Sequence, residues 1–162
     1  MAEINKVSTC LWFDGQAEEA ARFYVSLLPG SRISGITRYG EGAPVPEGTL
    51  LLVSFDLAGT PFMALNGGPH FKLSEAASIV IQCETQAEID WLWSRLLEGG
   101  GIEQQCFWLK DRFGLSWQIV PSQIGAWMNS GDSAAAARVM GVIMNSVKAD
   151  IAALEAAFQG RT

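Results

Sequence analysis

The stretch Ser78-Ile79-Val80-Ile81-Gln82-Cys83-Glu84-Thr85-Gln86-Ala87-Glu88-Ile89 decides the fold, because it joins a clear strand pattern to a clear helix start. Its apolar, β-branched beginning predicts a strand over 78–83. Thr85 is a good N-cap, so a helix is expected over 86–97, and Gly99-Gly100-Gly101 ends it. This part of the chain is therefore expected to be a strand followed directly by a helix.

An earlier part of the chain repeats this order. A strand is predicted over 7–13, and after a break at Asp14-Gly15 a helix is predicted over 17–28. A constant offset of 69 residues aligns Thr9 with Ser78 and carries the first helix onto the second. A shared offset over strand and helix indicates an internal duplication.

Each predicted helix is followed by further strand and turn patterns, so each half has the order βαβββ. The additional strands are predicted over 32–39, 49–57 and 60–65 in the first half and over 103–105, 107–110 and 115–120 in the second. We therefore expect an α+β fold in a single domain, 1–162, whose two modules form a mixed curved sheet around a cleft. The first module covers 4–68, the second 74–122, and a helical C-terminal extension 123–162.

The extension departs from the repeat. Asp132 or Ser133 is the expected N-cap of one helix, and a second short helix is expected over 150–158. Apolar residues fall on one face of the first helix at helical spacing, namely Val139, Met140, Ile143, Met144 and Val147. This stripe fits either a cover for the intramolecular core or the contact of a homodimer, which is the protein partner that we expect.

Composition and charge limit the other partners. The chain has 162 residues, of which 49% are hydrophobic and 17% charged, as is typical of a folded globular protein. Its formal net charge of -6 opposes binding to nucleic acid and to anionic membrane surfaces. No apolar run approaches the roughly 20 residues that cross a bilayer, and the N-terminus lacks a signal-peptide pattern. Three cysteines without metal or disulfide spacing favour a reducing cytoplasm.

Four local motifs carry a family resemblance. They are Leu11-Trp12-Phe13-Asp14-Gly15-Gln16-Ala17-Glu18-Glu19-Ala20, Leu65-Asn66-Gly67-Gly68-Pro69-His70-Phe71-Lys72, the stretch 106–121 and the stretch 150–157. Together they reach over nearly the whole chain. They resemble the PhnB-like branch of the vicinal oxygen chelate superfamily, which includes glyoxalases, bleomycin resistance proteins and dihydroxybiphenyl dioxygenases. The resemblance implies paired βαβββ modules.

Many members of this branch carry the label 3-demethylubiquinone-9 3-methyltransferase. The label implies S-adenosylmethionine binding, usually by a glycine-rich turn between a strand and a helix. No such turn is visible, because Gly99-Gly100-Gly101 follows a helix and Gly67-Gly68 precedes Pro69. We therefore expect no cofactor.

The resemblance also implies positions for metal ligands, because metal-using relatives place His or Glu on the first and last strands of each module. In the first module these positions fall on Thr9 and near Ala64, with Asn66 two residues beyond. In the second module they fall on Ser78 and Gln118. All of these side chains are neutral, and the chain has a single His. We therefore expect no bound metal.

Strand alternation predicts which side chains line the cleft. If Thr9 faces the cleft, Leu11 and Phe13 face it too, and Cys10 and Trp12 face the helix. An apolar lining with a few neutral hydrogen-bonding groups is typical of a ligand pocket. The candidate ligand-binding residues are Thr9, Leu11, Phe13, Asn66, His70, Ser78, Gln82, Cys106, Trp108 and Gln118.

Two of these candidates have an inert alternative. His70 is either an acid–base group at the mouth of the cleft or a loop histidine that fixes a turn. Cys106 has Lys110 nearby, which favours a reactive thiol, but a buried and inert cysteine is equally consistent with the sequence. Trp108 is expected at the rim of the cleft.

The function expected from these residues is metal-independent binding of a small, fairly apolar metabolite, with or without turnover. One alternative is a structural homodimer whose cleft is sealed. The other is the methyltransferase activity that the family label implies.

Overall fold

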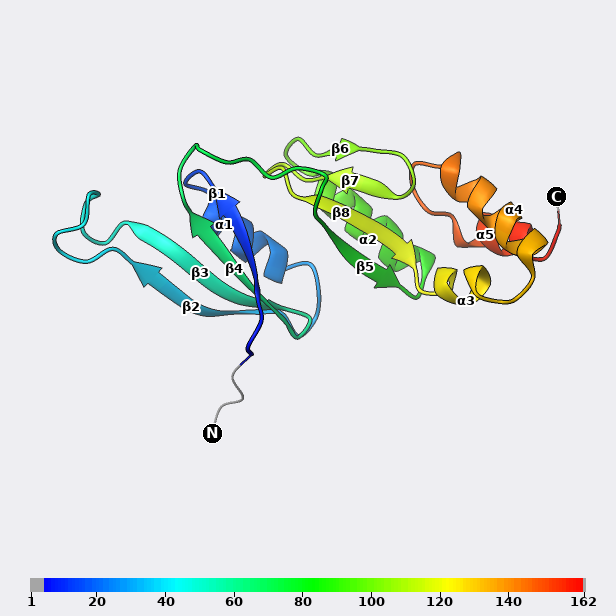
Figure 1. Ribbon diagram of the computed structural model, residues 1–162, viewed down its shortest axis with the longest axis horizontal. Helices are drawn as coiled ribbons and strands as arrows, with labels where there is room; N and C mark the ends of the chain where they lie inside the picture. The colour runs from blue at the N-terminus through cyan, green and yellow to red at the C-terminus, as the bar shows by residue number, and fades with distance from the viewer. Residues whose placement is uncertain (1–4, 162) are drawn as a thin grey trace. The chain divides into compact units, whose positions relative to one another are not determined.

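The protein consists of two compact units that divide between Leu73 and Ser74, seen in a computed structural model that describes residues 5–161 (Figure 1). The predicted first module begins at residue 4, outside the described residues, and otherwise lies in the first unit. The second module and the extension lie in the second unit. The single domain and the shared cleft stay predictions. No helix within 5–161 is long and apolar enough to cross a membrane.

The first unit is a four-stranded mixed sheet with one helix. Along the chain it contains β1 (Thr9–Phe13), α1 (Ala17–Val25), β2 (Arg32–Arg38), β3 (Leu50–Leu57) and β4 (Thr60–Asn66). The sheet order is β1-β4-β3-β2, in which β1 is parallel to β4 and the other neighbours are antiparallel. The parallel pair is possible because α1 and two strands separate β1 from β4 along the chain.

The second unit repeats this arrangement. It contains β5 (Ser78–Cys83), α2 (Gln86–Leu97), β6 (Ile102–Glu103), β7 (Trp108–Lys110) and β8 (Ser116–Pro121). The sheet order is β5-β8-β7-β6, again with a parallel pair, β5 and β8, and antiparallel neighbours. The common topology confirms the α+β class and the two βαβββ modules.

In each unit the helix covers one face of the sheet and buries the apolar side chains of that face. The ring of Tyr24 in α1 lies 6.2 Å from that of Phe55 in β3, and Phe55 stacks on Phe62 of β4 at 5.4 Å. In the second unit Trp93 of α2 and Ile119 of β8 are 4% and 0% exposed. Burial of each such side chain stabilises the fold by roughly 1.5–3 kcal/mol.

The extension forms three helices, α3 (Ile124–Met128), α4 (Ser133–Met144) and α5 (Ile151–Phe158). Asp132 caps α4 by accepting a 2.9 Å hydrogen bond from the backbone N–H of Ala135, so one of the two expected caps is confirmed. The helix α3 was not predicted, because its five residues are too few to show a helical repeat.

The apolar stripe of α4 is only partly covered. Val139 is fully buried, whereas Met140 and Met144 are 42% and 60% exposed. Arg138 joins α4 to α5, since its Nε donates to the carbonyl oxygen of Ala157 at 2.7 Å. The stripe thus contributes to the core through Val139, and the homodimer contact stays a prediction.

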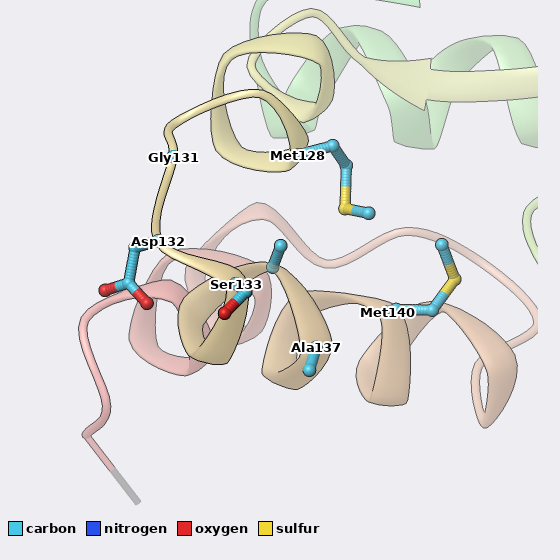
Figure 2. A pocket seen from close by; sticks show the side chains of 7 residues that line it. Met128, Gly131, Asp132, Ser133, Ala137 and Met140 are labelled. Carbon is cyan, nitrogen blue, oxygen red and sulfur yellow. The ribbon is translucent and has the colours of Figure 1, made fainter.

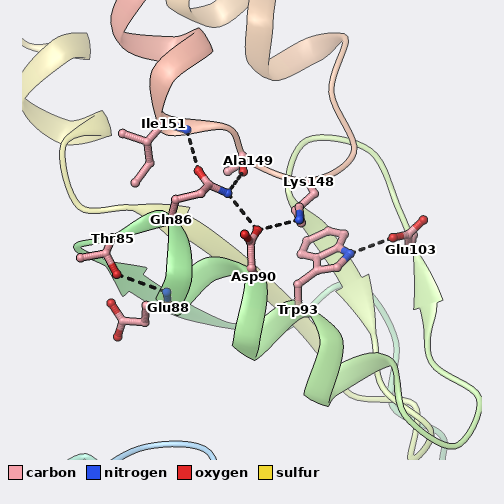
Figure 3. Close-up of polar contacts among 9 residues, drawn as sticks. All are labelled: Thr85, Gln86, Glu88, Asp90, Trp93, Glu103, Lys148, Ala149 and Ile151. Atoms are coloured by element: carbon pink, nitrogen blue, oxygen red, sulfur yellow. Dashed lines mark hydrogen bonds and ion pairs between the residues drawn. The ribbon is translucent and has the colours of Figure 1, made fainter.

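A side-chain amide ties the extension to α2 (Figure 3). Gln86 Nε2 donates to the carbonyl oxygen of Ala149 at 3.0 Å, and Gln86 Oε1 accepts from the backbone N–H of Ile151 at 2.9 Å. Lys148 Nζ lies 2.6 Å from Asp90 Oδ1. The contacts from Lys148 and then Gln86 lower the pKa of Asp90. The start of α5 is therefore held by side chains of α2.

Candidate functional site

The second sheet has one face that α2 does not cover. Ile81 of β5 pairs with Ile119 of β8, and both are buried on the face toward α2. Side chains alternate along a strand, so the paired residues Val80 and Gln118 lie on the opposite face. Val80 is accordingly 50% exposed. We call this face the open face of the second sheet; it carries Ser78, Val80, Gln82, Trp108, Ser116 and Gln118.

Three predicted binding residues come together on the open face. Gln118 Nε2 donates a 2.9 Å hydrogen bond to Ser78 Oγ. Trp108 of β7 pairs with Gln118 across the strands, so its side chain lies on the same face. Gln82 lies farther along β5 and is exposed. The face therefore combines an amide, a hydroxyl and an aromatic ring.

Ser116 supplies an unusual group on this face. It pairs with Ser78 in the β5–β8 register and is 0% exposed. Its Oγ has no hydrogen-bond partner among the residues that the structure describes. A buried hydroxyl without a partner costs about 1–3 kcal/mol. Because Ser116 is fully covered, a ligand can bond to its Oγ only when the side chains that cover it move.

An ion pair that the sequence did not indicate lies beside Ser116. Lys110 of β7 pairs with Ser116 across the strands and contacts the Glu75 carboxylate. Gln104 Nε2 also donates to Glu75, at 3.2 Å. These contacts, chiefly the hydrogen bond from Lys110, lower the pKa of Glu75 to about 2. Glu75 escaped prediction because it lies in a connecting segment with no periodic pattern.

In the first sheet the predicted faces of β1 were wrong. Leu11 pairs with Ala64 and Thr9 with Phe62, whose ring lies on the face toward α1. Thr9, Leu11 and Phe13 therefore lie on the helix side, and Leu11 and Phe13 are only 6% and 3% exposed. Leu11 and Phe13 belong to the core, whereas Thr9 is exposed. None of the three faces the other side of the sheet.

The physical reason is the length of one connection. Three residues, Asp14-Gly15-Gln16, join β1 to α1, whereas two, Glu84-Thr85, join β5 to α2. The helices therefore align at an offset of 69 residues but the strands at 70, which places Phe13 opposite Cys83 in the repeat. A shift of one residue moves every side chain of a strand to the other face.

Asn66 has a structural role, and its binding role stays a prediction. Its Oδ1 accepts a 2.9 Å hydrogen bond from the backbone N–H of Ala17, the first residue of α1. Its Nδ2 donates to the carbonyl oxygen of Leu50 at 3.4 Å. Gln16, the residue before α1, forms no side-chain cap. Asn66 therefore caps α1 from the end of β4.

The corrected alignment identifies the first-sheet counterparts of the open-face residues. Ser8 takes the position of Ser78, and Met63, which pairs with Cys10, takes the position of Gln118. Met63 has no amide group, so Ser8 and Met63 cannot form the amide–hydroxyl contact found in the second sheet. Sequence reasoning missed Ser8 and Met63 because the offset of 69 was extended from the helices into the strands.

A pocket of about 310 Å³ lies on the first sheet beside these residues. Three serine hydroxyls line it, from Ser8, Ser34 and Ser54. Arg32 and Asp56 also line it and form an ion pair, with 3.2 Å between Nε and Oδ2. The pocket is polar, and its two charges balance each other.

Trp12 also lies on the face that α1 does not cover, contrary to its predicted place in the core. Its Nε1 donates to the carbonyl oxygen of Gly68 at 2.8 Å, and its ring meets that of Phe71 edge-on at 4.9 Å. A Cβ at Gly67 would lie 2.3 Å from the Trp12 ring, so glycine is required there. His70 is exposed in this same connection.

Cys106 lies apart from the open face. It precedes β7, and its backbone N–H donates to the carbonyl oxygen of Ser146 at 2.9 Å. Its Sγ lies 3.8 Å from Met144 Sδ. Lys110 contacts Glu75 and not the thiol. The structure therefore gives no support to an activated Cys106 thiol.

The residues at the implied metal positions do not fit a divalent ion. Ser78 and Gln118 are neutral and bond to each other. The nearby carboxylate of Asp111 accepts from the backbone N–H groups of Phe113 and Leu115 and from Trp117 Nε1, at 2.8, 3.1 and 2.8 Å. Within 5–161 no three His, Cys, Asp or Glu side chains are grouped closely enough to hold a metal ion.

The strand-to-helix connections likewise do not fit S-adenosylmethionine. Such a cofactor is usually held by a glycine-rich turn. The connection Asp14-Gly15-Gln16 contains one glycine, and Glu84-Thr85 contains none. Neither turn has the expected form.

Comparison with known proteins identifies the family. The model of the family described as 3-demethylubiquinone-9 3-methyltransferase matches residues 5–120. A Bacillus cereus structure described as a 3-demethylubiquinone-9 3-methyltransferase, PhnB protein, is 35% identical, with a TM-score of 0.66 over 73% of this chain and 100% of that chain. A comparison with curated proteins gives no match.

Two further solved structures are similar to the chain at lower sequence identity. A Pseudomonas aeruginosa protein is 22% identical with a TM-score of 0.59, over 73% of this chain and 98% of that chain, which shows the fold alone. A glyoxalase/bleomycin resistance protein/dioxygenase domain from Frankia is 15% identical with a TM-score of 0.46, over 75% and 98%. The family match ends at residue 120, so the predicted resemblance of 150–157 is not part of it. The chain belongs to the 3-demethylubiquinone-9 3-methyltransferase family.

Proposed function

We propose that the chain binds a small, neutral organic molecule on the open face of the second sheet, without a metal ion. The observation that supports this most directly is the buried Ser116 hydroxyl, which has no partner within the described residues and lies beside the Ser78–Gln118 pair. Polar groups in a ligand site are normally few and are satisfied by the ligand. Ser116 and the Ser78–Gln118 pair supply such groups.

The chemistry of the face favours a neutral ligand that can both donate and accept hydrogen bonds. The Ser116 hydroxyl and the Gln118 amide can each do both. A charged ligand would lose hydration without a partner ion, because Lys110 is already paired with Glu75. Trp108 offers an aromatic surface next to Gln118, so a ligand with a planar ring is preferred.

A matched pair of probes tests this preference. 4-Hydroxyacetophenone is neutral with one hydroxyl and one carbonyl group, and 4-hydroxybenzoate has the same ring with a carboxylate. We expect the first to raise Tm and to change tryptophan fluorescence in a saturable way, since a ligand that binds only the folded state stabilises it. Equal or tighter binding of 4-hydroxybenzoate would contradict the proposal.

Two variants locate the site. Gln118→Leu removes the amide, and we expect Kd for 4-hydroxyacetophenone to rise about tenfold, as for one lost hydrogen bond of about 1.4 kcal/mol. Ser116→Ala should weaken binding while leaving stability unchanged or higher, because it removes a hydroxyl that lacks a partner. Gln159→Leu, the same change at the residue that follows α5, is the control and should bind as the unaltered protein does.

The two other candidate functions give different results in the same assay. A methyltransferase, the activity named in the family description, would be stabilised by S-adenosylmethionine. A sealed structural face would respond to neither probe nor cofactor. Stoichiometric zinc, nickel or iron in the purified protein, lost in Gln118→Leu, would overturn metal-independent binding.

A further inference from the structure

A groove of about 410 Å³ lies in the extension, between α3 and α4 (Figure 2). Met128 of α3 and Met140 of α4 extend into it from its two sides. Ala136 and Ala137 also line it. Asp132 and Ser133 form its polar end, where α4 begins. A volume of this size falls within the usual range of small-molecule sites.

The groove exists because of how the chain turns between the two helices. Gly131 has φ of +85°, a conformation that residues with a Cβ adopt only at a cost, and it lets the chain reverse directly into α4. Ala136 and Ala137 line the groove with small side chains, where longer ones would fill more of the space. The apolar lining is thus left open to a ligand.

The groove has one charged side chain, which lies beside the positive N-terminal end of α4. Among its lining residues Asp132 alone is charged. Its Oδ1 accepts the hydrogen bond from Ala135 N–H at 2.9 Å, which leaves its other oxygen for a ligand. The nearest arginine along α4, Arg138, is directed to α5, where it donates to the carbonyl oxygens of Ala157 and Phe158 at 2.7 and 2.9 Å.

We propose that this groove binds a small organic cation with an aromatic or alkyl body, whose ammonium group pairs with Asp132. The thioethers of Met128 and Met140 are flexible and polarisable, and sulfur makes favourable contacts with aromatic rings. The net charge of -6 adds a general attraction for cations. An anion would meet the Asp132 carboxylate and is disfavoured.

This site is independent of the open face. The groove is lined by residues 128–140, whereas the family match covers 5–120. It is therefore a feature of the extension and not of the βαβββ modules. Loss of binding at one site leaves the other proposal intact.

Three probes of one shape test the charge preference: benzylammonium, benzyl alcohol and benzoate. Binding is followed by NMR of protein with ¹³C-labelled methionine methyl groups, since Met128 and Met140 line the groove. We expect saturable shifts of these two methyl signals with benzylammonium, smaller ones with benzyl alcohol and none with benzoate. Equal shifts with all three probes, or none with benzylammonium, would overturn the proposal.

Paired capping variants separate charge from helix stability. Asp132→Ser keeps an N-cap and removes the charge, and we expect benzylammonium affinity to fall about two- to fivefold, as for an exposed ion pair. Asp150 caps α5 in the same way, by accepting from Ala153 N–H at 3.1 Å, so Asp150→Ser is the matched control. Unchanged affinity in Asp132→Ser would refute the pairing.

A third variant fills the groove without weakening the helix. Leucine is a good helix former, so Ala136→Leu should preserve α4 while its side chain occupies the space between the methionines. We expect the methionine shifts with benzylammonium to disappear in this variant. Undiminished binding would place the cation outside the groove and refute the site.

Discussion

β1 and β5 hold the same place in two sheets of one topology, yet the open faces that they help to form are chemically different. The open face of the second sheet carries two neutral polar residues, Ser78 of β5 and Gln118 of β8. The corresponding positions on the first sheet are Ser8 and Met63. The buried faces remained alike: Leu11 and Ile81 are both 6% exposed. A duplicated module can thus preserve its helix-covered core while the uncovered face acquires different chemistry.

The hairpins before the last strand of each sheet differ as well. In the first unit β3 and β4 are joined by the two residues Ala58-Gly59, with φ of 47° and 86°. In the second unit the longer turn after β7 is organised by the buried carboxylate of Asp111. The turn of the first unit depends on the backbone conformation of Ala58 and Gly59, and the turn of the second unit depends on the side chain of Asp111. The two turns are therefore sensitive to different kinds of substitution.

The largest expected effect is the loss of Asp111. Asp111→Ala leaves the N–H groups of Phe113, Leu115 and Trp117 without their acceptor at a position that is 4% exposed. We expect the free energy of unfolding to fall by about 3–5 kcal/mol, because buried charged hydrogen bonds are the costly ones to break. Urea denaturation measures this change. A loss below about 1 kcal/mol would mean that the turn forms without the carboxylate.

The helix caps provide the next comparison. Thr85 caps α2 locally, accepting from Glu88 N–H at 3.2 Å, whereas α1 is capped by Asn66 from a distant strand. We expect Asn66→Ala to cost about 2 kcal/mol, since it also loses a contact to Leu50, and Thr85→Ala about 1 kcal/mol.

Thermal and urea unfolding of the two cap variants measure this difference. Gln16→Ala is the control for the first helix, because Gln16 forms no side-chain cap, and it should be nearly neutral. If Gln16→Ala costs as much as Asn66→Ala, α1 is capped locally and the comparison fails.

These two caps also show what a sequence reveals and what it does not. Thr85 and the helix behind it were predicted, because a local cap and a local periodicity leave a local signal. The role of Asn66 was not, since it depends on the register between β1 and β4. The hydroxyl of Ser116, which has no partner among the described residues, depends in the same way on its three-dimensional surroundings.

The wrong faces of β1 have a different cause. The sequence contains every residue needed to align β1 with β5 correctly, including Gly15 in the longer strand-to-helix connection. The error came from carrying one offset through a connection whose length differs by one residue. Leu11 and Phe13 are apolar, which fits both a buried core and the lining of a pocket. Periodicity alone could not decide between core and pocket, and the structure shows that both side chains are buried.

The two-residue turn of the first unit is expected to gain from substitution. Ala58 has a Cβ in the left-handed region, where Asn is better tolerated, and Asn-Gly is the preferred pair in two-residue hairpins. We expect Ala58→Asn to stabilise the protein by about 0.5–1 kcal/mol in urea denaturation. Gly59→Ala is the opposite test and should destabilise it, because φ there is 86°. Destabilisation by Ala58→Asn would contradict the assigned turn.

The smallest expected effect concerns the Lys110–Glu75 ion pair beside the open face of the second sheet. The pKa of Glu75 is lowered from 4.5 to about 2, chiefly by the hydrogen bond from Lys110, so its charged form is favoured in the folded protein. Its contribution to stability is therefore present above pH 4.5 and is lost as the pH falls toward 2. We expect Tm of Glu75→Gln to decline less steeply over this range than Tm of the unaltered protein. Lys110→Met should reduce the slope in the same way, because it removes the other half of the pair; if both variants keep the full slope, other carboxylates control the acid sensitivity of the second unit.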